Sequence, residues 1–188
     1  MRTDIYTESH GIETILVKME KVGQLCGLSA SETGKLRLLT EEMLTLTVRL
    51  FDNLSYEFFA ESSEKQFKLS LTAATRVSQS DREKLLSVSK SGKNKATQGV
   101  FGKISGIFES LVMESCDYEQ LIVPTYDSMG LMPYFVLSSY RDEIPKLAKE
   151  EQDEMWDGLE KSIIATLAKD VIIGVRSSKV EMVVLAEF

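Results

Sequence analysis

The segment GLSASETGKLRLLTEEMLTLTVRLFDN, residues 27–53, has the pattern of a long helix that is buried on more than one side. Ser29 and Glu32 stand at the spacing of a capping box, in which each side chain accepts a hydrogen bond from the other residue's backbone N–H. The apolar residues that follow recur at the spacing of one helix face: Leu36, Leu39, Met43, Leu46 and Leu50. Leu38, Leu44 and Val48 add a second apolar flank, which predicts neighbours on several sides of the helix.

Two adjacent glutamates, Glu41 and Glu42, lie within this apolar helix. A carboxylate is costly to bury unless it has a partner or a function. One explanation places a glutamate at the helix edge in water, and the other points it into a ligand cleft. The residues of the helix alone leave both explanations open.

Helical patterns also stand before and after this segment. Residues 8–26 have apolar residues at helical spacing and end at Gly27, which is expected in the position just past the helix. Residues 153–169 have an apolar stripe, with Asp153 as the expected cap. Pro133 is expected to open a further short helix.

Two hairpins complete the predicted elements. Residues 56–60 and 67–73 are predicted as the two strands of a hairpin with a polar turn at 61–65, and the second strand alternates apolar and polar side chains from Phe67 to Leu71. Residues 171–176 and 179–188 are rich in β-branched residues on both faces, which suits strands inside a sheet covered by helices. The order of elements predicts an α+β two-layer sandwich of helices on a mixed β-sheet, with the last hairpin inside it.

A stretch rich in glycine and lysine, from Ser80 to Val112, combines two properties of an anion-binding loop. Glycines let backbone N–H groups approach an anion closely, and lysines supply positive charge. The spacing of a P-loop is absent, and a solvated surface loop explains the composition equally well. The candidate anion-binding or nucleotide-binding residues are Lys93, Lys95, Gly99, Gly102 and Lys103.

Length and composition exclude several classes of protein. The 188 residues favour one domain, residues 1–188, in which 113–152 has the character of an insertion. The net charge of −7 argues against broad nucleic-acid binding. No segment approaches the roughly 18 apolar residues of a membrane span, and the first residues lead into no apolar signal sequence. Cys26 and Cys116 have no metal-ligand spacing and fit a reducing cytoplasm, so we expect a cytoplasmic protein.

The order of elements, together with three local motifs, resembles the GHKL superfamily of histidine kinase-like ATPases, and within it the stand-alone anti-sigma factor kinases. The acidic helix motif of that family resembles TEEMLTLT at residues 40–47, and its glycine pair resembles Gly99 and Gly102 in QGVFGKI. Its closing helix and hairpin resemble residues 160–188. The resemblance implies a Bergerat-type ATP-binding fold, with Glu42 as the general base and ATP as the expected ligand.

The sequence departs from the family at two of its three nucleotide-binding elements. The asparagine that binds Mg²⁺ in the family is replaced by Leu46, which offers no oxygen to the cation. The family's aspartate, which recognises adenine, has no counterpart in residues 72–77. No metal-binding residue is therefore assigned.

These departures favour a regulatory binding module that acts through a protein partner and has weak nucleotide binding or none. A second copy of the chain is an alternative partner. An active ATP-dependent serine kinase or ATPase that uses Glu42, and a purely structural domain, are the competing hypotheses.

Overall fold

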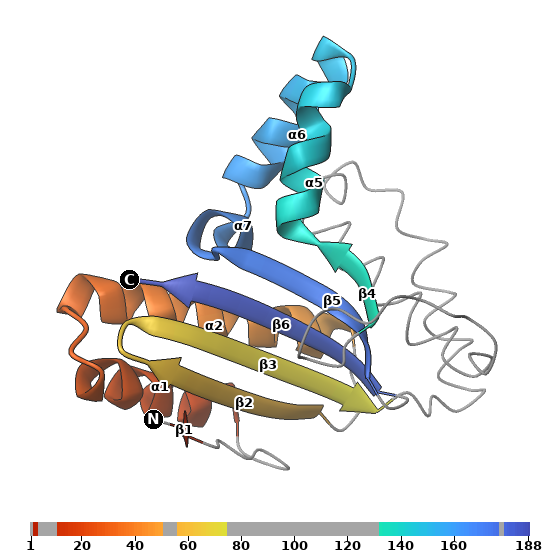
Figure 1. Cartoon of the computed structure of the whole chain (residues 1–188). Coiled ribbons are helices and arrows are strands. Elements are labelled where there is room, and N and C mark those ends of the chain that lie inside the picture. Colours follow the sequence, from red (N-terminus) through yellow and green to blue (C-terminus); the bar gives the residue numbers. More distant parts are fainter. Residues whose placement is uncertain (1, 4–10, 51–55, 75–131, 177–178) are drawn as a thin grey trace.

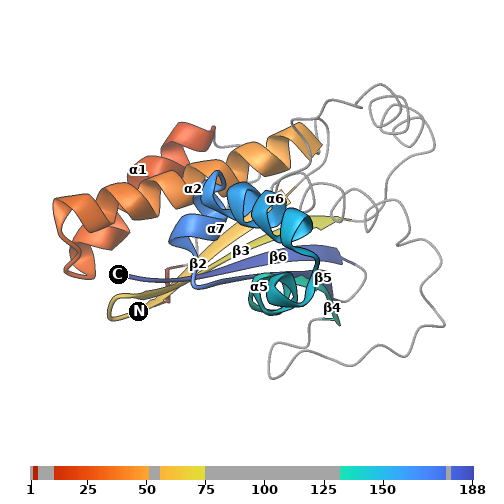
Figure 2. The ribbon, with the colours of Figure 1, turned by 90° about the horizontal axis from the view of Figure 1, so that it is seen from above.

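The computed structural model in Figure 1 describes residues 2–3, 11–50, 56–74, 132–176 and 179–188. The strands of these residues form one sheet. Helices α1 (Ile12–Leu25), α2 (Ala30–Leu50) and α7 (Ile163–Leu167) cover one of its faces (Figure 2). This arrangement confirms the α+β class, and it confirms the helices expected at 8–26 and 30–52 over Ile12–Leu25 and Ala30–Leu50.

The sheet has six strands in the order β1-β2-β3-β6-β5-β4. Their bounds are β1 Arg2–Thr3, β2 Tyr56–Ser63, β3 Gln66–Ala74, β4 Met132–Val136, β5 Asp170–Arg176 and β6 Lys179–Glu187. The last hairpin lies in the interior of the sheet, as the sequence predicts. Every pairing between described strands is antiparallel, so the expectation of a mixed sheet is wrong for this part of the chain.

Side chains alternate between the two faces of the sheet. On β3, Phe67, Leu69 and Leu71 are buried and join the main core beneath the helices. On the opposite face, Ile172 and Val183 are also buried and form a small separate cluster. Both faces of the last hairpin therefore carry buried apolar side chains, which agrees with its two-sided β-branched sequence.

The connection between α1 and α2 is fixed by backbone hydrogen bonds. Gly27 has a φ of +76°, a conformation that glycine adopts without the strain a Cβ would cause. Leu28 N–H donates to the carbonyl oxygen of Gly23 at 3.0 Å, and Gly27 N–H donates to that of Gln24 at 3.1 Å. These two bonds are the Schellman arrangement that ends a helix, so the predicted position of Gly27 is confirmed.

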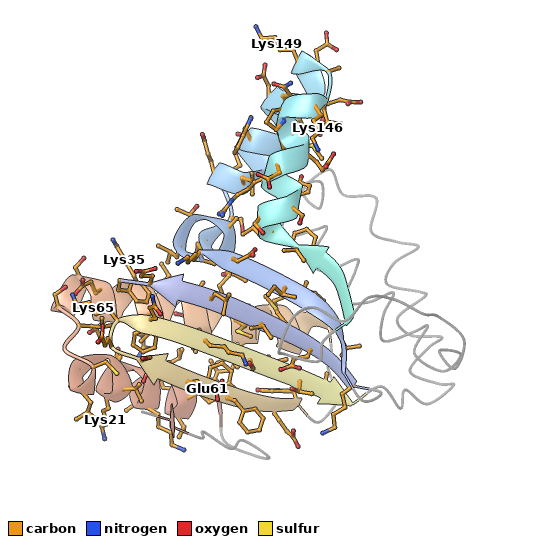
Figure 3. All side chains as sticks on the ribbon, in the orientation of Figure 1. Lys21, Lys35, Glu61, Lys65, Lys146 and Lys149 are labelled. Atoms are coloured by element: carbon orange, nitrogen blue, oxygen red, sulfur yellow. The ribbon has the colours of Figure 1, made fainter. Side chains whose placement is uncertain are left out.

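The start of α2 has the predicted capping box. Ser29 N–H donates to Glu32 Oε2 at 2.7 Å, and Glu32 N–H donates to Ser29 Oγ at 3.3 Å. Lys65, which is labelled in Figure 3, lies at the turn between β2 and β3. It donates to Glu32 Oε1 at 2.8 Å. This hydrogen bond, together with those from Ser29, lowers the pKa of Glu32 to about 2.

The first hairpin is longer than the sequence predicts. β2 continues to Ser63 and β3 begins at Gln66, so the turn is Glu64 and Lys65 rather than residues 61–65. Glu64 has a φ of 56°, which belongs to the left-handed region that tight hairpin turns use. Polar residues at 61–63 gave the segment the composition of a loop, although its backbone stays paired.

The helix expected at Pro133 is wrong, because Pro133 lies in strand β4 and helix α5 (Leu137–Glu143) begins after it. β4 pairs only with β5 among the described strands, and its register shifts between Pro133 and Phe135. Proline lacks a backbone N–H and cannot donate to a neighbouring strand. It is tolerated at an edge strand or a bulge, where that hydrogen bond is not needed.

The helix expected at residues 153–169 is also wrong in its bounds. Helix α6 spans Lys149–Glu160, so Asp153 lies inside it rather than at its cap. The chain then turns at Ser162, whose hydroxyl accepts from Ala165 N–H at 3.2 Å and starts α7. We call α5, the short 3-10 helix η4 (Ile144–Lys146) and α6 the helical arm. The arm projects away from the sheet (Figure 1).

Candidate functional site

The candidate site is built on α2, whose burial is uneven around its axis. Leu36, Leu39, Met43, Leu44 and Leu46 are buried in the main core. Glu41 is exposed, and Glu42 is half-buried. The explanation that places a glutamate at the helix edge therefore fits Glu41, whereas Glu42 lies at the boundary between the core and the surface.

The neighbours of Glu42 along α2 define this boundary. Leu46, one turn later, is 1% exposed, whereas Leu38, one turn earlier, is 43% exposed. Arg37, on the other flank of the helix, donates to Glu13 and Glu20 of α1 at 3.0 and 2.9 Å. The Arg37 flank therefore faces α1.

The carboxylates of Glu13 and Glu20 raise the pKa of Arg37, and the hydrogen bond to Glu13 has the largest effect. Figures 1 and 2 show α2 between α1 and α7, and α2 contacts both of them. Glu42 thus lies on the flank of α2 that is turned away from α1.

The residues of α2 do not fit a magnesium ion in the way the family resemblance implies. The oxygen ligand would come from position 46, where Leu46 is enclosed by the apolar core. Leucine has no donor atom for a hard cation, and the site is filled by packing. Among the described residues, no group of three His, Cys, Asp or Glu side chains is arranged to hold a metal.

The remaining predicted site residues, Lys93, Lys95, Gly99, Gly102 and Lys103, lie outside the described residues. So do residues 75–77 of the stretch 72–77 that was compared with the family's adenine-binding segment, whereas residues 72–74 lie in β3. Of the predicted site residues, the structure therefore places Glu42 alone.

A groove that the sequence did not indicate crosses the ends of β2, β3 and β6 and has a volume of about 320 Å³. Glu61 pairs with Lys68 at 3.3 Å, and Glu187 pairs with Lys169 at 2.9 Å (Glu61 is labelled in Figure 3). The hydrogen bond from Lys169 lowers the pKa of Glu187. The charges at this groove are thus already compensated within the protein. Glu61 and Lys68 face each other across the β2–β3 hairpin. The two ion pairs meet in one groove only through the pairing of β3 with β6, which no local pattern encodes.

Comparison with known proteins finds no matching family model, no matching curated protein and no matching solved structure. None of the helices in the described ranges is both long and apolar enough to cross a membrane.

Proposed function

We propose that this chain is a regulatory binding module on a degenerate histidine kinase-like ATP-binding fold, and that it acts through contacts with a protein partner. The observation that carries the proposal is the burial of Leu46. A side chain that is 1% exposed and packed in the main core is a structural residue, and it stands where the family has its magnesium ligand. Phosphoryl transfer depends on that metal to neutralise the charge on the phosphates.

An active kinase or ATPase is the second candidate, and Glu42 is the residue that favours it. Its side chain is half-buried at the edge of the core, and no hydrogen bond or ion pair joins it to another described residue. A general base needs such a position, close to solvent and to a ligand. The two candidates differ in whether Glu42 has a metal-bound phosphate to act on.

Thermal unfolding with ATP, in the presence and absence of Mg²⁺, shows whether the protein binds the nucleotide. A ligand at a hundredfold its dissociation constant stabilises the folded state by about 2.7 kcal/mol. We expect little or no stabilisation by ATP and no increase when Mg²⁺ is added. Any stabilisation that does occur should fall as salt is raised, because lysines such as Lys93 and Lys103 would provide it.

ATP turnover is the decisive measurement. We expect no Mg²⁺-dependent hydrolysis above buffer, and no hydrolysis in the Leu46→Asn variant, because one restored oxygen in a closed core does not rebuild the site. Robust hydrolysis in the unmodified protein that Glu42→Ala abolishes would overturn the proposal and establish the kinase or ATPase alternative.

A further inference from the structure

Helix α6 is largely exposed to solvent. Of its twelve residues only Leu159 is buried. It belongs to the helical arm, which extends beyond the sheet, with Lys146 and Lys149 at its far end (Figure 3). Six of the twelve residues are acidic and one is basic. Most of its surface is therefore available to a partner and is negatively charged.

An aromatic side chain lies on this surface. Trp156 is 42% exposed, and it is the only tryptophan in the protein. Asp153 precedes it by three residues and Glu160 follows it by four, so both lie next to it on the same face of the helix. Both are exposed. Asp157 is paired with Lys161 at 2.6 Å, whereas no described residue bonds to the carboxylate of Asp153 or Glu160.

The charges of α6 stabilise the helix only in part: Glu150 and Glu151 suit its first turn, and Asp157 pairs with Lys161. Glu150 and Glu154, and likewise Asp153 and Asp157, stand four residues apart, where like charges repel each other. Trp156 adds a large aromatic side chain that is not among the residues of the main core. Together they match one kind of ligand, because a cation is attracted both by carboxylates and by the face of an indole ring. Nucleic acids and anionic membranes would be repelled by the same charges.

We propose that the face of α6 formed by Asp153, Trp156 and Glu160 is the docking surface for a basic segment of a protein partner. An arginine of that segment lies on the indole, and its guanidinium group pairs with the two carboxylates. Tryptophan and arginine are the residues that most often dominate protein interfaces. The proposal rests on the proposed regulatory function, since it names the partner's chemistry and the surface that receives it.

The fluorescence of the single tryptophan tests this directly in the full chain. A short oligo-arginine peptide, capped at both ends, should change the emission of Trp156 saturably, and an uncharged peptide of the same length should not. The Asp153→Asn/Glu160→Gln variant should weaken the affinity about tenfold, as expected for two exposed ion pairs. Both substituted residues are exposed, and circular dichroism is the check that each variant remains folded.

A matched control removes the same charge from another part of the same helix. Glu151 and Glu154 stand five and two residues from Trp156, spacings at which side chains do not face each other. The Glu151→Gln/Glu154→Gln variant should lose no more than about twofold in affinity. Equal losses in the two variants would mean that the peptide binds the acidic surface without a site, and would overturn the proposal.

Two further outcomes would also overturn it. A non-saturating response would show that no defined surface exists. A blue shift of Trp156 that grows with protein concentration in the absence of peptide would assign this face to a second copy of the chain. None of these results depends on ATP turnover, so failure of the docking surface is distinguishable from failure of the proposed function.

Discussion

Helices α2 and α6 show how differently two helices of one chain can be held. α2 lies between α1 and α7 and contributes five apolar side chains that are almost completely buried: Leu36, Leu39, Met43, Leu44 and Leu46. Of the residues of α6, only Leu159 is buried in the main core, and the partly buried Met155 packs against it. Most helical stability in proteins comes from packing rather than from propensity, so α6 must depend on other contacts.

Those contacts include hydrogen bonds at the far end of the helical arm and between the arm and the segment that contains α7. Gln152 Nε2 donates to the carbonyl oxygen of Leu147 at 2.8 Å and fixes the entry to α6. Arg141 donates to the backbone carbonyl oxygens of Ala165 and Lys169. Polar contacts of this kind orient the arm, whereas apolar burial holds α2. The difference predicts that the two helices respond unequally to the same substitution.

The largest expected effect comes from truncating one leucine at a time. Leu46→Ala on α2 should cost about 2–5 kcal/mol, because it opens a cavity in the main core. Leu159→Ala on α6 should cost less than Leu46→Ala, since the arm can adjust around it. Leu38→Ala, at an exposed position of α2, should cost under about 1 kcal/mol. Urea unfolding measures all three.

The order of these three losses is the informative result. A loss for Leu159→Ala as large as that for Leu46→Ala would show that the arm and the core unfold as one unit, and the contrast between α2 and α6 would fail. A small loss for Leu46→Ala would instead mean that position 46 borders a cleft, which would restore the family's arrangement of the helix.

Sequence patterns predicted the fold well where one helix or strand has its own local signals. The Schellman arrangement at Gly27 and the capping box of Ser29 and Glu32 are encoded within a few residues, and the structure has both. The errors in helix bounds fall in the arm and in the segment that follows it. There Asp153 resembles a helix cap but lies inside α6, and Ser162, which does start a helix, was missed. The apolar stripe continues across Ser162, so it does not show that the helix is interrupted.

The site could be predicted only in part. The sequence identified Glu42 and Leu46, and the structure places the first at the edge of the core and the second within it. The sequence did not indicate that Lys68 and Lys169 would line one groove, because their proximity depends on the pairing of β3 with β6. It also placed Trp156 in an apolar stripe, although the residue is partly exposed. Spacing predicts which side chains share a face, but not whether a neighbour covers that face.

Two buried threonines of α2, Thr33 and Thr40, differ in whether their hydroxyls are hydrogen-bonded. Thr40 Oγ1 donates to the carbonyl oxygen of Leu36 at 2.8 Å, whereas Thr33 Oγ1 is buried with no hydrogen-bond partner among the described residues. Thr33→Val should therefore raise the free energy of unfolding by about 1 kcal/mol, because it removes an unpaired hydroxyl at nearly constant volume. Thr40→Val should lower it by a similar amount. The matched pair is measured by urea unfolding, and a loss in both variants would show that Thr33 has a partner after all.

The smallest expected effect concerns the starts of the two helices. α2 is capped by Ser29 and Glu32, whereas the N-cap position of α6 is Ala148, which offers no side-chain cap. The pKa of Glu32 is lowered from 4.5 to about 2, first by the hydrogen bond from Lys65. A carboxylate whose folded pKa is depressed stabilises the folded state fully above its unfolded pKa. That stabilisation is lost as the pH falls from about 4.5 toward about 2.

Glu32→Gln should therefore lower the midpoint of thermal unfolding near neutral pH, and its difference from the unmodified protein should shrink through that window as both forms become uncharged. Lys65→Gln should narrow the pH range over which this stabilisation is lost, because the hydrogen bond from Lys65 is the principal cause of the lowered pKa of Glu32. The effect is modest, since the pair lies at the surface and salt screens it. A difference that stays constant from neutral pH to about pH 2 would mean that Glu32 acts through its shape in the capping box rather than through its charge. In that case the beginnings of α2 and α6 would differ in hydrogen bonding alone.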